Sequence, residues 1–195
     1  MLTRLICALA ALVLVIPGVS AGGVTEVSKE YGPIRTEIAL KRQGDKIIYE
    51  LSGRIDPGAE RLLERLAGER EGGWLVLNSE GGDEYSSMSI GRIAHRLKLK
   101  TYVAPNALCL SGCAVIWAGG HERWVARGGV LGFHSPWYVQ DGKAYDGDPR
   151  RLAAYYKELK IPPAAITRLL APSSTFYFLT EHDAEKLGID SRWND

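Results

Sequence analysis

The sequence predicts an α/β domain built around a largely parallel β-sheet. Short apolar segments typical of strands alternate with amphipathic segments of helical length along most of the 195-residue chain. Strands and helices that alternate in this way favour right-handed crossovers between parallel strands. The chain contains no internal repeat, low-complexity tract or interior linker, which indicates a single domain.

The first predicted elements form a β-hairpin. Residues 34–40 alternate between apolar and polar side chains, the sequence Arg-Gln-Gly-Asp turns the chain at 42–45, and residues 46–52 provide the second strand. A helix follows the turn at Asp56 and ends at Gly68.

Strands and helices alternate through the rest of the chain. The predicted strands cover residues 74–77, 99–103, 124–125, 130–133 and 176–179, and the predicted helices cover residues 83–97, 149–159, 162–170 and 181–187, with a further helix opening at Ser111. Residues 137–148 form a polar segment that predicts a loop.

Residues 1–21 are expected to be a signal peptide. Arg4 gives a basic start, residues 5–19 are almost entirely apolar, and Val19-Ser-Ala21 matches a cleavage site of small residues. A membrane anchor is the alternative, but an apolar run of about 15 residues is shorter than the ~20 that a spanning helix needs. We therefore expect cleavage after Ala21, one mature domain over residues 22–195 with no stable membrane span, and a periplasmic or secreted location.

The charge balance argues against two classes of partner. The chain has 24 basic and 23 acidic residues and a net charge of +1, and Arg4 would leave with the signal peptide. A mature chain without net charge gives no reason to expect nucleic acid or an acidic membrane surface as a partner.

Two cysteines remain after the signal peptide, and they bracket a serine. Cys109 and Cys113 each stand one residue away from Ser111. In an exported protein such a pair favours a disulfide, which would hold the serine turn in shape. The bridge requires Cys109 to precede the helix, because this spacing is strained within a regular helix. Two reduced packing residues are the alternative, and the pair alone does not predict a zinc or other metal site.

Three motifs together suggest acyl-transfer chemistry. Ser111 opens an apolar helical run, His134 ends an apolar strand, and Gly81-Gly82 follows another apolar strand. A nucleophile, a base and a glycine loop that offers backbone N–H groups are the parts of such a site. Each motif also has a simpler explanation: a helix N-cap, a hydrogen-bonded core histidine and a tight turn. Of the chain's four histidines, however, only His134 stands where a strand end meets a loop.

These segments resemble the proteolytic subunit of the Clp protease (ClpP). The sequence Asn78-Ser-Glu-Gly-Gly82, the turn around Ser111, the His-x-Pro at His134 and the closing segment Asp183-Ala-Glu-Lys-Leu-Gly-Ile-Asp190 are similar to motifs of that family. The resemblance extends over residues 47–190. It implies the repeated ββα spiral of the ClpP/crotonase superfamily and a homo-oligomer, because members of this superfamily form trimers, hexamers or heptameric rings.

Carried over by position, the resemblance implies roles for four residues. Ser111 matches the nucleophile and His134 the base, while Gly82 and Gly112 match the residues whose backbone N–H groups form the oxyanion hole. The implied substrate is a peptide or protein, and no cofactor is implied. A crotonase-like reaction on coenzyme A thioesters fits less well, because the signal peptide would remove the chain from that cofactor.

The chain departs from the family in two places. Phe176 stands where the family has its triad aspartate, and the segment between His134 and Phe176 does not resemble the long handle that joins two rings. We therefore expect neither a two-ring barrel nor an ATPase partner. The chain is more similar to exported ClpP-like proteins of unknown function in which Cys-x-Ser-x-Cys and Gly-Phe-His-Ser recur.

The sequence thus predicts an exported serine hydrolase, a peptidase that uses Ser111 and His134. Ser174, Thr175, a main-chain carbonyl or an aspartate of residues 137–148 could orient His134 in place of the missing aspartate, and we expect a slow or selective enzyme. The alternative is a non-catalytic ClpP-like protein of the cell envelope that binds peptide or acyl ligands in the same cleft.

Overall fold

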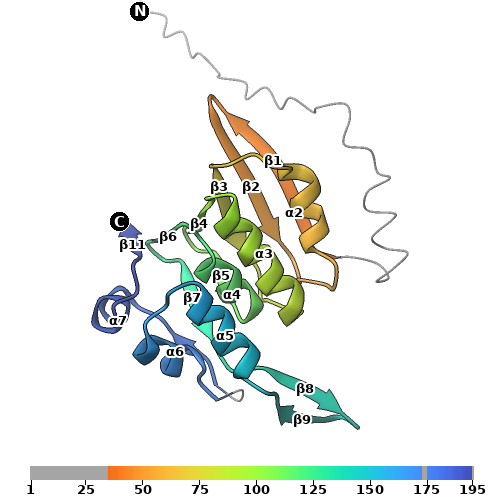
Figure 1. Cartoon of the computed structure of the whole chain (residues 1–195), viewed down its shortest axis with the longest axis vertical. Coiled ribbons are helices and arrows are strands. Elements are labelled where there is room, and N and C mark those ends of the chain that lie inside the picture. The colour runs from red at the N-terminus through yellow and green to blue at the C-terminus, as the bar shows by residue number, and fades with distance from the viewer. Residues whose placement is uncertain (1–34, 173–174, 195) are drawn as a thin grey trace, which may run out of the picture.

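The computed structural model describes residues 35–172 and 175–194 (Figure 1). The predicted signal peptide, Ile34 and Ser174 lie outside these ranges. Within the described residues, no helix combines the length and the apolar character needed to cross a membrane.

Six strands form a large sheet in the order β1-β2-β3-β4-β6-β11. Their bounds are β1 (Glu37–Gln43), β2 (Lys46–Ser52), β3 (Trp74–Asn78), β4 (Lys100–Val103), β6 (Glu122–Ala126) and β11 (Arg192–Asn194). Strands β1 and β2 form the predicted antiparallel hairpin, and every other neighbouring pair is parallel. The predicted α/β fold with a largely parallel sheet is confirmed.

One face of this sheet packs against helices. The helices are α2 (Glu60–Ala67), α3 (Glu84–Arg96) and α4 (Gly112–Ala118). Alternate strand residues, among them Leu75, Leu77, Val103 and Val125, are buried in one core with these helices. The intervening strand residues are only partly buried, which is the pattern of a sheet covered on a single face.

Three further strands form a second, smaller sheet. Its order is β10-β7-β5, with β5 (Leu108–Leu110) parallel to β7 (Val130–Phe133) and β10 (Tyr177–Phe178) antiparallel to β7. Successive units now repeat as a strand of the large sheet, a strand of the small sheet and a helix. The complete units are β4-β5-α4 and β6-β7-α5 (Arg150–Glu158). An earlier unit, β3-α3, has a single residue in place of the small-sheet strand: Ser79, which forms an isolated bridge to Cys109 of β5. This is the predicted ββα spiral.

The C-terminal helices lie close to their predicted positions. Helix α6 is Pro163–Leu169 and α7 is Glu181–Leu187. The Thr180 side chain accepts a hydrogen bond from the Asp183 amide, and Gly188 ends α7 in the left-handed conformation, as the sequence predicts.

The prediction of a loop over residues 137–148 is wrong. Strands β8 (Trp137–Gln140) and β9 (Lys143–Asp146) form an antiparallel hairpin that projects from the body of the molecule (Figure 1). Asp141 and Gly142 at its tip both have positive φ, 50° and 73°. Asp-Gly is a preferred pair for a two-residue hairpin turn, and this local signal outweighs the polarity of the segment.

Candidate active site

Ser111 is the junction between strand β5 and helix α4. Its φ of 55° and ψ of −122° are unfavourable for a residue with a side chain, at a cost of about 1–3 kcal/mol. Its amide donates to the Gly132 carbonyl of β7 (2.9 Å), and its carbonyl accepts from the Val115 amide of α4 (3.2 Å). The contacts on both sides therefore hold the residue in this conformation.

The Ser111 side chain does not cap the helix that it precedes. It makes no capping hydrogen bond, and its Oγ instead lies 2.7 Å from Nε2 of His134. His134 follows β7, the parallel neighbour of β5, so both residues leave the small sheet at the same edge. The structure thus brings the predicted nucleophile and base together and excludes the simple cap as an explanation of the serine.

The cysteines on either side of Ser111 form a disulfide. Their Cα atoms are 5.0 Å apart, within the usual range for a bridge. Cys109 lies in β5 and Cys113 in the first turn of α4, the arrangement that the spacing requires. The bridge spans the Ser111 turn and is fully buried.

The Gly81-Gly82 loop lies against Ser111 and Gly112. A Cβ atom added to Gly81 would lie 2.7 Å from Cβ of Ser111, and one added to Gly112 would lie 3.2 Å from the amide nitrogen of Gly82. Gly82 has a φ of 151°, and a Cβ there would come within 2.0 Å of the Ile55 carbonyl oxygen. Larger residues therefore cannot replace these glycines without moving the loops apart.

The amides of Gly82 and Gly112 have no hydrogen-bond acceptor among the described residues. Neighbouring donors of the same loop are used: the Gly81 amide donates to Ser79 Oγ (3.0 Å) and the Asp83 amide donates to the Ile55 carbonyl (2.7 Å). The two amides are thus available beside the Ser111 turn.

The other ring nitrogen of His134 meets a main-chain group. Nδ1 lies 2.6 Å from the carbonyl oxygen of Ser135. The ring of Phe176 packs edge-on against the imidazole, with centroids 5.0 Å apart and planes at 87°. No carboxylate among the described residues contacts His134, and Asp148 is instead paired with Arg150. The Arg150 hydrogen bonds hold the pKa of Asp148 well below its ordinary value.

One acidic residue near the glycine loop has a raised pKa. Glu84 opens helix α3 two residues after Gly82, and its partial burial raises the pKa of the carboxyl, an effect that Arg151 counteracts. The part of the chain that the structure describes contains no group of three His, Cys, Asp or Glu side chains able to hold a metal ion.

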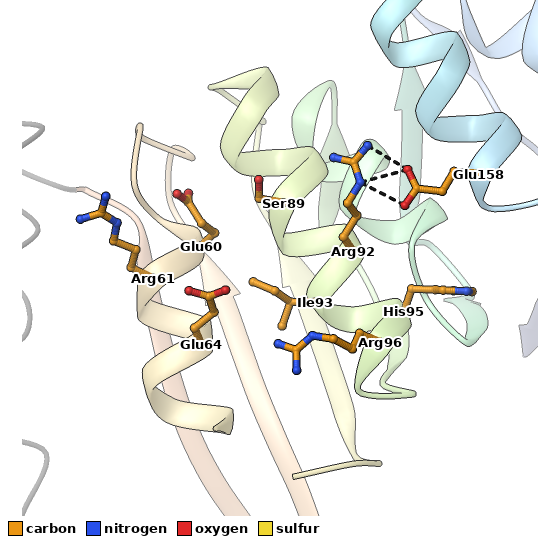
Figure 2. Close-up of a pocket in the computed structure, with 9 residues that line it drawn as sticks. All are labelled: Glu60, Arg61, Glu64, Ser89, Arg92, Ile93, His95, Arg96 and Glu158. Carbon is orange, nitrogen blue, oxygen red and sulfur yellow. Dashed lines mark hydrogen bonds and ion pairs between the residues drawn. The ribbon is translucent and has the colours of Figure 1, made fainter. Parts of the chain in front are cut away.

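A pocket lies elsewhere, against helices α2 and α3 (Figure 2). It has a volume of about 580 Å³ and contains neither Ser111 nor His134. Charged side chains dominate its lining, and Arg92 is engaged there by Glu158 (2.9 Å). No nucleophile and base are in contact among the residues that line this pocket, whereas Ser111 and His134 are in contact. The candidate active site is therefore at Ser111.

Comparisons with known proteins give structural relatives. No protein-family model matches the sequence, and no curated protein matches it. Among solved structures, the chain is similar to a serine-to-alanine mutant of the 1510-N membrane-bound stomatin-specific protease, with a TM-score of 0.60, 21% identity and coverage of 75% of this chain and 77% of that one. It is similar also to a lysine-to-alanine mutant of the same protease in complex with a substrate peptide, with a TM-score of 0.61, 22% identity and coverage of 78% and 77%. At these identities the similarity shows the fold alone, and it agrees with the predicted α/β fold built on a largely parallel sheet.

Proposed function

We propose that the protein is an exported serine hydrolase of the ClpP type, most simply a peptidase. The observation that carries this proposal is the 2.7 Å contact between Ser111 Oγ and His134 Nε2 at a strained strand-to-helix turn. Strained backbone at a nucleophile is a common feature of active sites. Protease relatives of the same fold add support.

The proposed reaction proceeds through an acyl-enzyme. His134 Nε2 accepts the proton of Ser111 as Oγ attacks the substrate carbonyl carbon, and the amides of Gly82 and Gly112 stabilise the resulting oxyanion. Collapse of this intermediate expels the leaving group, to which His134 returns the proton. Water, activated by His134, then hydrolyses the ester on Ser111 and restores the free enzyme.

A second candidate function is a non-catalytic protein that binds peptides or acyl groups in the same place. The specific observation in its favour is the exposed ring of Phe176, which packs against the His134 imidazole where a triad would have a carboxylate, with further exposed apolar side chains on the β8–β9 hairpin. This alternative predicts binding without covalent chemistry.

A fluorophosphonate probe distinguishes the two functions. Its phosphorus forms a bond to an activated serine Oγ and releases fluoride. We expect the purified protein to be labelled at Ser111, with labelling abolished in Ser111→Ala and slowed about 100-fold or more in His134→Ala. Ser89→Ala is the matched control, because Ser89 lines the pocket on α3 and not the Ser111 turn.

Labelling that persists in Ser111→Ala would contradict the assignment of the nucleophile. A wild-type protein that stays unlabelled but binds extended peptides in calorimetry would support the binding function. Where the protein is labelled, peptide mapping identifies the modified serine.

A further inference from the structure

The hydrogen bond at Nδ1 determines which tautomer His134 adopts. A neutral imidazole carries one N–H, and a carbonyl oxygen can only accept a hydrogen bond. At 2.6 Å from the Ser135 carbonyl, Nδ1 must therefore carry the proton. Nε2 then presents its lone pair to Ser111 Oγ at 2.7 Å, which is the form that can act as a base.

The residue that bears this carbonyl is held by two hydrogen bonds of its own. The Ser135 amide donates to the Ala171 carbonyl (2.6 Å), and Ser135 Oγ donates to the Leu170 carbonyl (3.0 Å). Leu170 is the C-cap of α6, where the last carbonyls of a helix have no partner within the helix. Ser135 therefore supplies hydrogen-bond donors to carbonyl groups at the end of α6, and the same hydrogen bonds restrict the position of Ser135.

The residue after Ser135 restricts it further. Pro136 disfavours helical conformations of the preceding residue, and the Pro136 carbonyl accepts a hydrogen bond from the Gly147 amide (2.7 Å). The short segment after His134 is thus tied both to the end of α6 and to the base of the β8–β9 hairpin.

We infer that Ser135 is a positioning residue for His134, and that the end of helix α6 acts through it. This inference rests on the proposed hydrolase function. The main-chain carbonyl of Ser135 orients the imidazole, a task that a carboxylate performs in a Ser-His-Asp triad. Because the carbonyl is neutral, it fixes the tautomer but compensates less of the charge that the imidazolium acquires during the reaction. A slow enzyme follows from this difference.

The test compares Ser135→Ala with a matched control. Ser135→Ala removes the hydrogen bond to Leu170 and leaves the carbonyl in place, so the imidazole loses part of its alignment. We expect the maximal rate of fluorophosphonate labelling, kinact, to fall about three- to tenfold, with KI unchanged. Ser135→Thr should restore the rate. Thr167→Ala deletes a comparable hydroxyl-to-carbonyl bond within α6 (3.3 Å, to Pro163) without touching Ser135 and should leave kinact unchanged.

Nitrogen-15 NMR of the imidazole gives a readout that does not depend on activity. We expect the neutral imidazole of wild-type His134 to carry its proton at Nδ1 and not at Nε2, and the Nδ1 proton to exchange faster with water in Ser135→Ala. Protonation at Nε2 in the wild type would overturn the inference even if Ser135→Ala did not fold. So would equal kinact values in Ser135→Ala and Thr167→Ala. If Ser111 resists labelling in every variant while the Nδ1 tautomer is observed, the hydrolase proposal fails and the positioning of His134 stands.

Discussion

Phe176 determines much of the surroundings of His134 at the level of single residues. Its ring packs edge-on against the imidazole and is 41% exposed, so the residue borders the site without being part of the core. An aromatic ring at this position excludes water from one side of the imidazole but offers no charge. The site therefore has an uncharged aromatic ring where a Ser-His-Asp triad would have a carboxylate.

Replacing Phe176 with aspartate tests this description. In Phe176→Asp a carboxylate beside the imidazole would favour its charged form. We expect faster fluorophosphonate labelling, by about tenfold or more, given that loss of a triad aspartate costs on the order of 10⁴. Because labelling requires the unprotonated imidazole, the pH at which the rate is half-maximal should move upward. Labelling rates measured across the neutral pH range, on both sides of the ordinary histidine pKa, would show both effects.

Phe178→Asp is the control for this substitution. The ring centroids of Phe178 and Phe176 are 5.8 Å apart, and Phe178 is 53% exposed. The variant therefore places the same charge nearby but not against His134. Identical pH profiles for the two variants would show that the position of the charge is immaterial and that our description of the site is wrong.

The contact between Ser111 and His134 could be predicted from the sequence, but the groups that hold the two residues in place could not. A serine at a strand-to-helix turn and a histidine at a strand end have recognisable local surroundings, which made Ser111 and His134 predictable. Ser135 contributes through its main-chain carbonyl, and every residue has such a group, so no side-chain pattern could identify it. The family resemblance placed Phe176 at the position of the triad aspartate, but the packing of its ring against His134 depends on the pairing of β10 with β7, which is a tertiary property.

At the scale of elements, the β5–Ser111–α4 turn is stabilised by a very short covalent loop. The Cys109–Cys113 bridge closes a loop with sequence separation of 4. By the chain-entropy model, a loop this short contributes only about 2 kcal/mol to stability. Its main effect should instead be on the geometry of the residue that it spans.

Removing the disulfide should therefore lower the reactivity of Ser111 as well as the stability of the fold. In Cys109→Ala/Cys113→Ala we expect the labelling rate of Ser111 to fall about tenfold or more, because the strained conformation loses a constraint. The free energy of unfolding in urea should fall by about 2 kcal/mol. Wild-type protein treated with a dithiol until both thiols can be alkylated should match the variant. A labelling rate equal to that of the untreated protein would contradict this role of the bridge.

Some elements could not be predicted because their cause is not local. Strand β11 is three residues long and pairs with β6, which lies far before it in the sequence. Buried Arg123 of β6 connects the two regions through a hydrogen bond to the Asp190 carbonyl (3.2 Å). A three-residue strand has no usable periodicity, and this contact exists only in the folded chain. The long helices and the β1–β2 hairpin, by contrast, follow from local patterns.

At the scale of the whole molecule, large exposed apolar side chains are concentrated on or beside strands of the small sheet and on the β8–β9 hairpin. Among the described residues, the large apolar side chains with the greatest exposure, other than Tyr85, lie on β5, on the β8–β9 hairpin and at β10. They are Leu108, Trp137, Tyr138, Val139, Tyr145, Phe176 and Phe178. A two-stranded hairpin is marginally stable alone, and contiguous apolar surface usually marks an interaction site.

We expect this surface to support self-association. Light scattering over a wide dilution series should give a mass above that of the monomer at the higher concentrations. Trp137→Ser/Val139→Ser should shift the protein toward the monomer, because the two side chains lie on the same face of the exposed hairpin. Tyr85→Ser, which removes a comparably exposed ring from α3, is the control. A monomer at every concentration would show that this expectation is wrong.

The ββα spiral also has a consequence for folding kinetics. Gly82, Ser111 and His134 come from three successive units of the spiral, and each unit contributes one part of the site. No single unit, and no fragment that ends before β7, can hold a reactive serine. Parallel pairing of strands that are far apart in the sequence is slow, so we expect the site to be completed late in folding. Recovery of Ser111 reactivity during refolding would thus follow the slowest phase rather than the early appearance of helices, and thermal loss of reactivity would coincide with global melting.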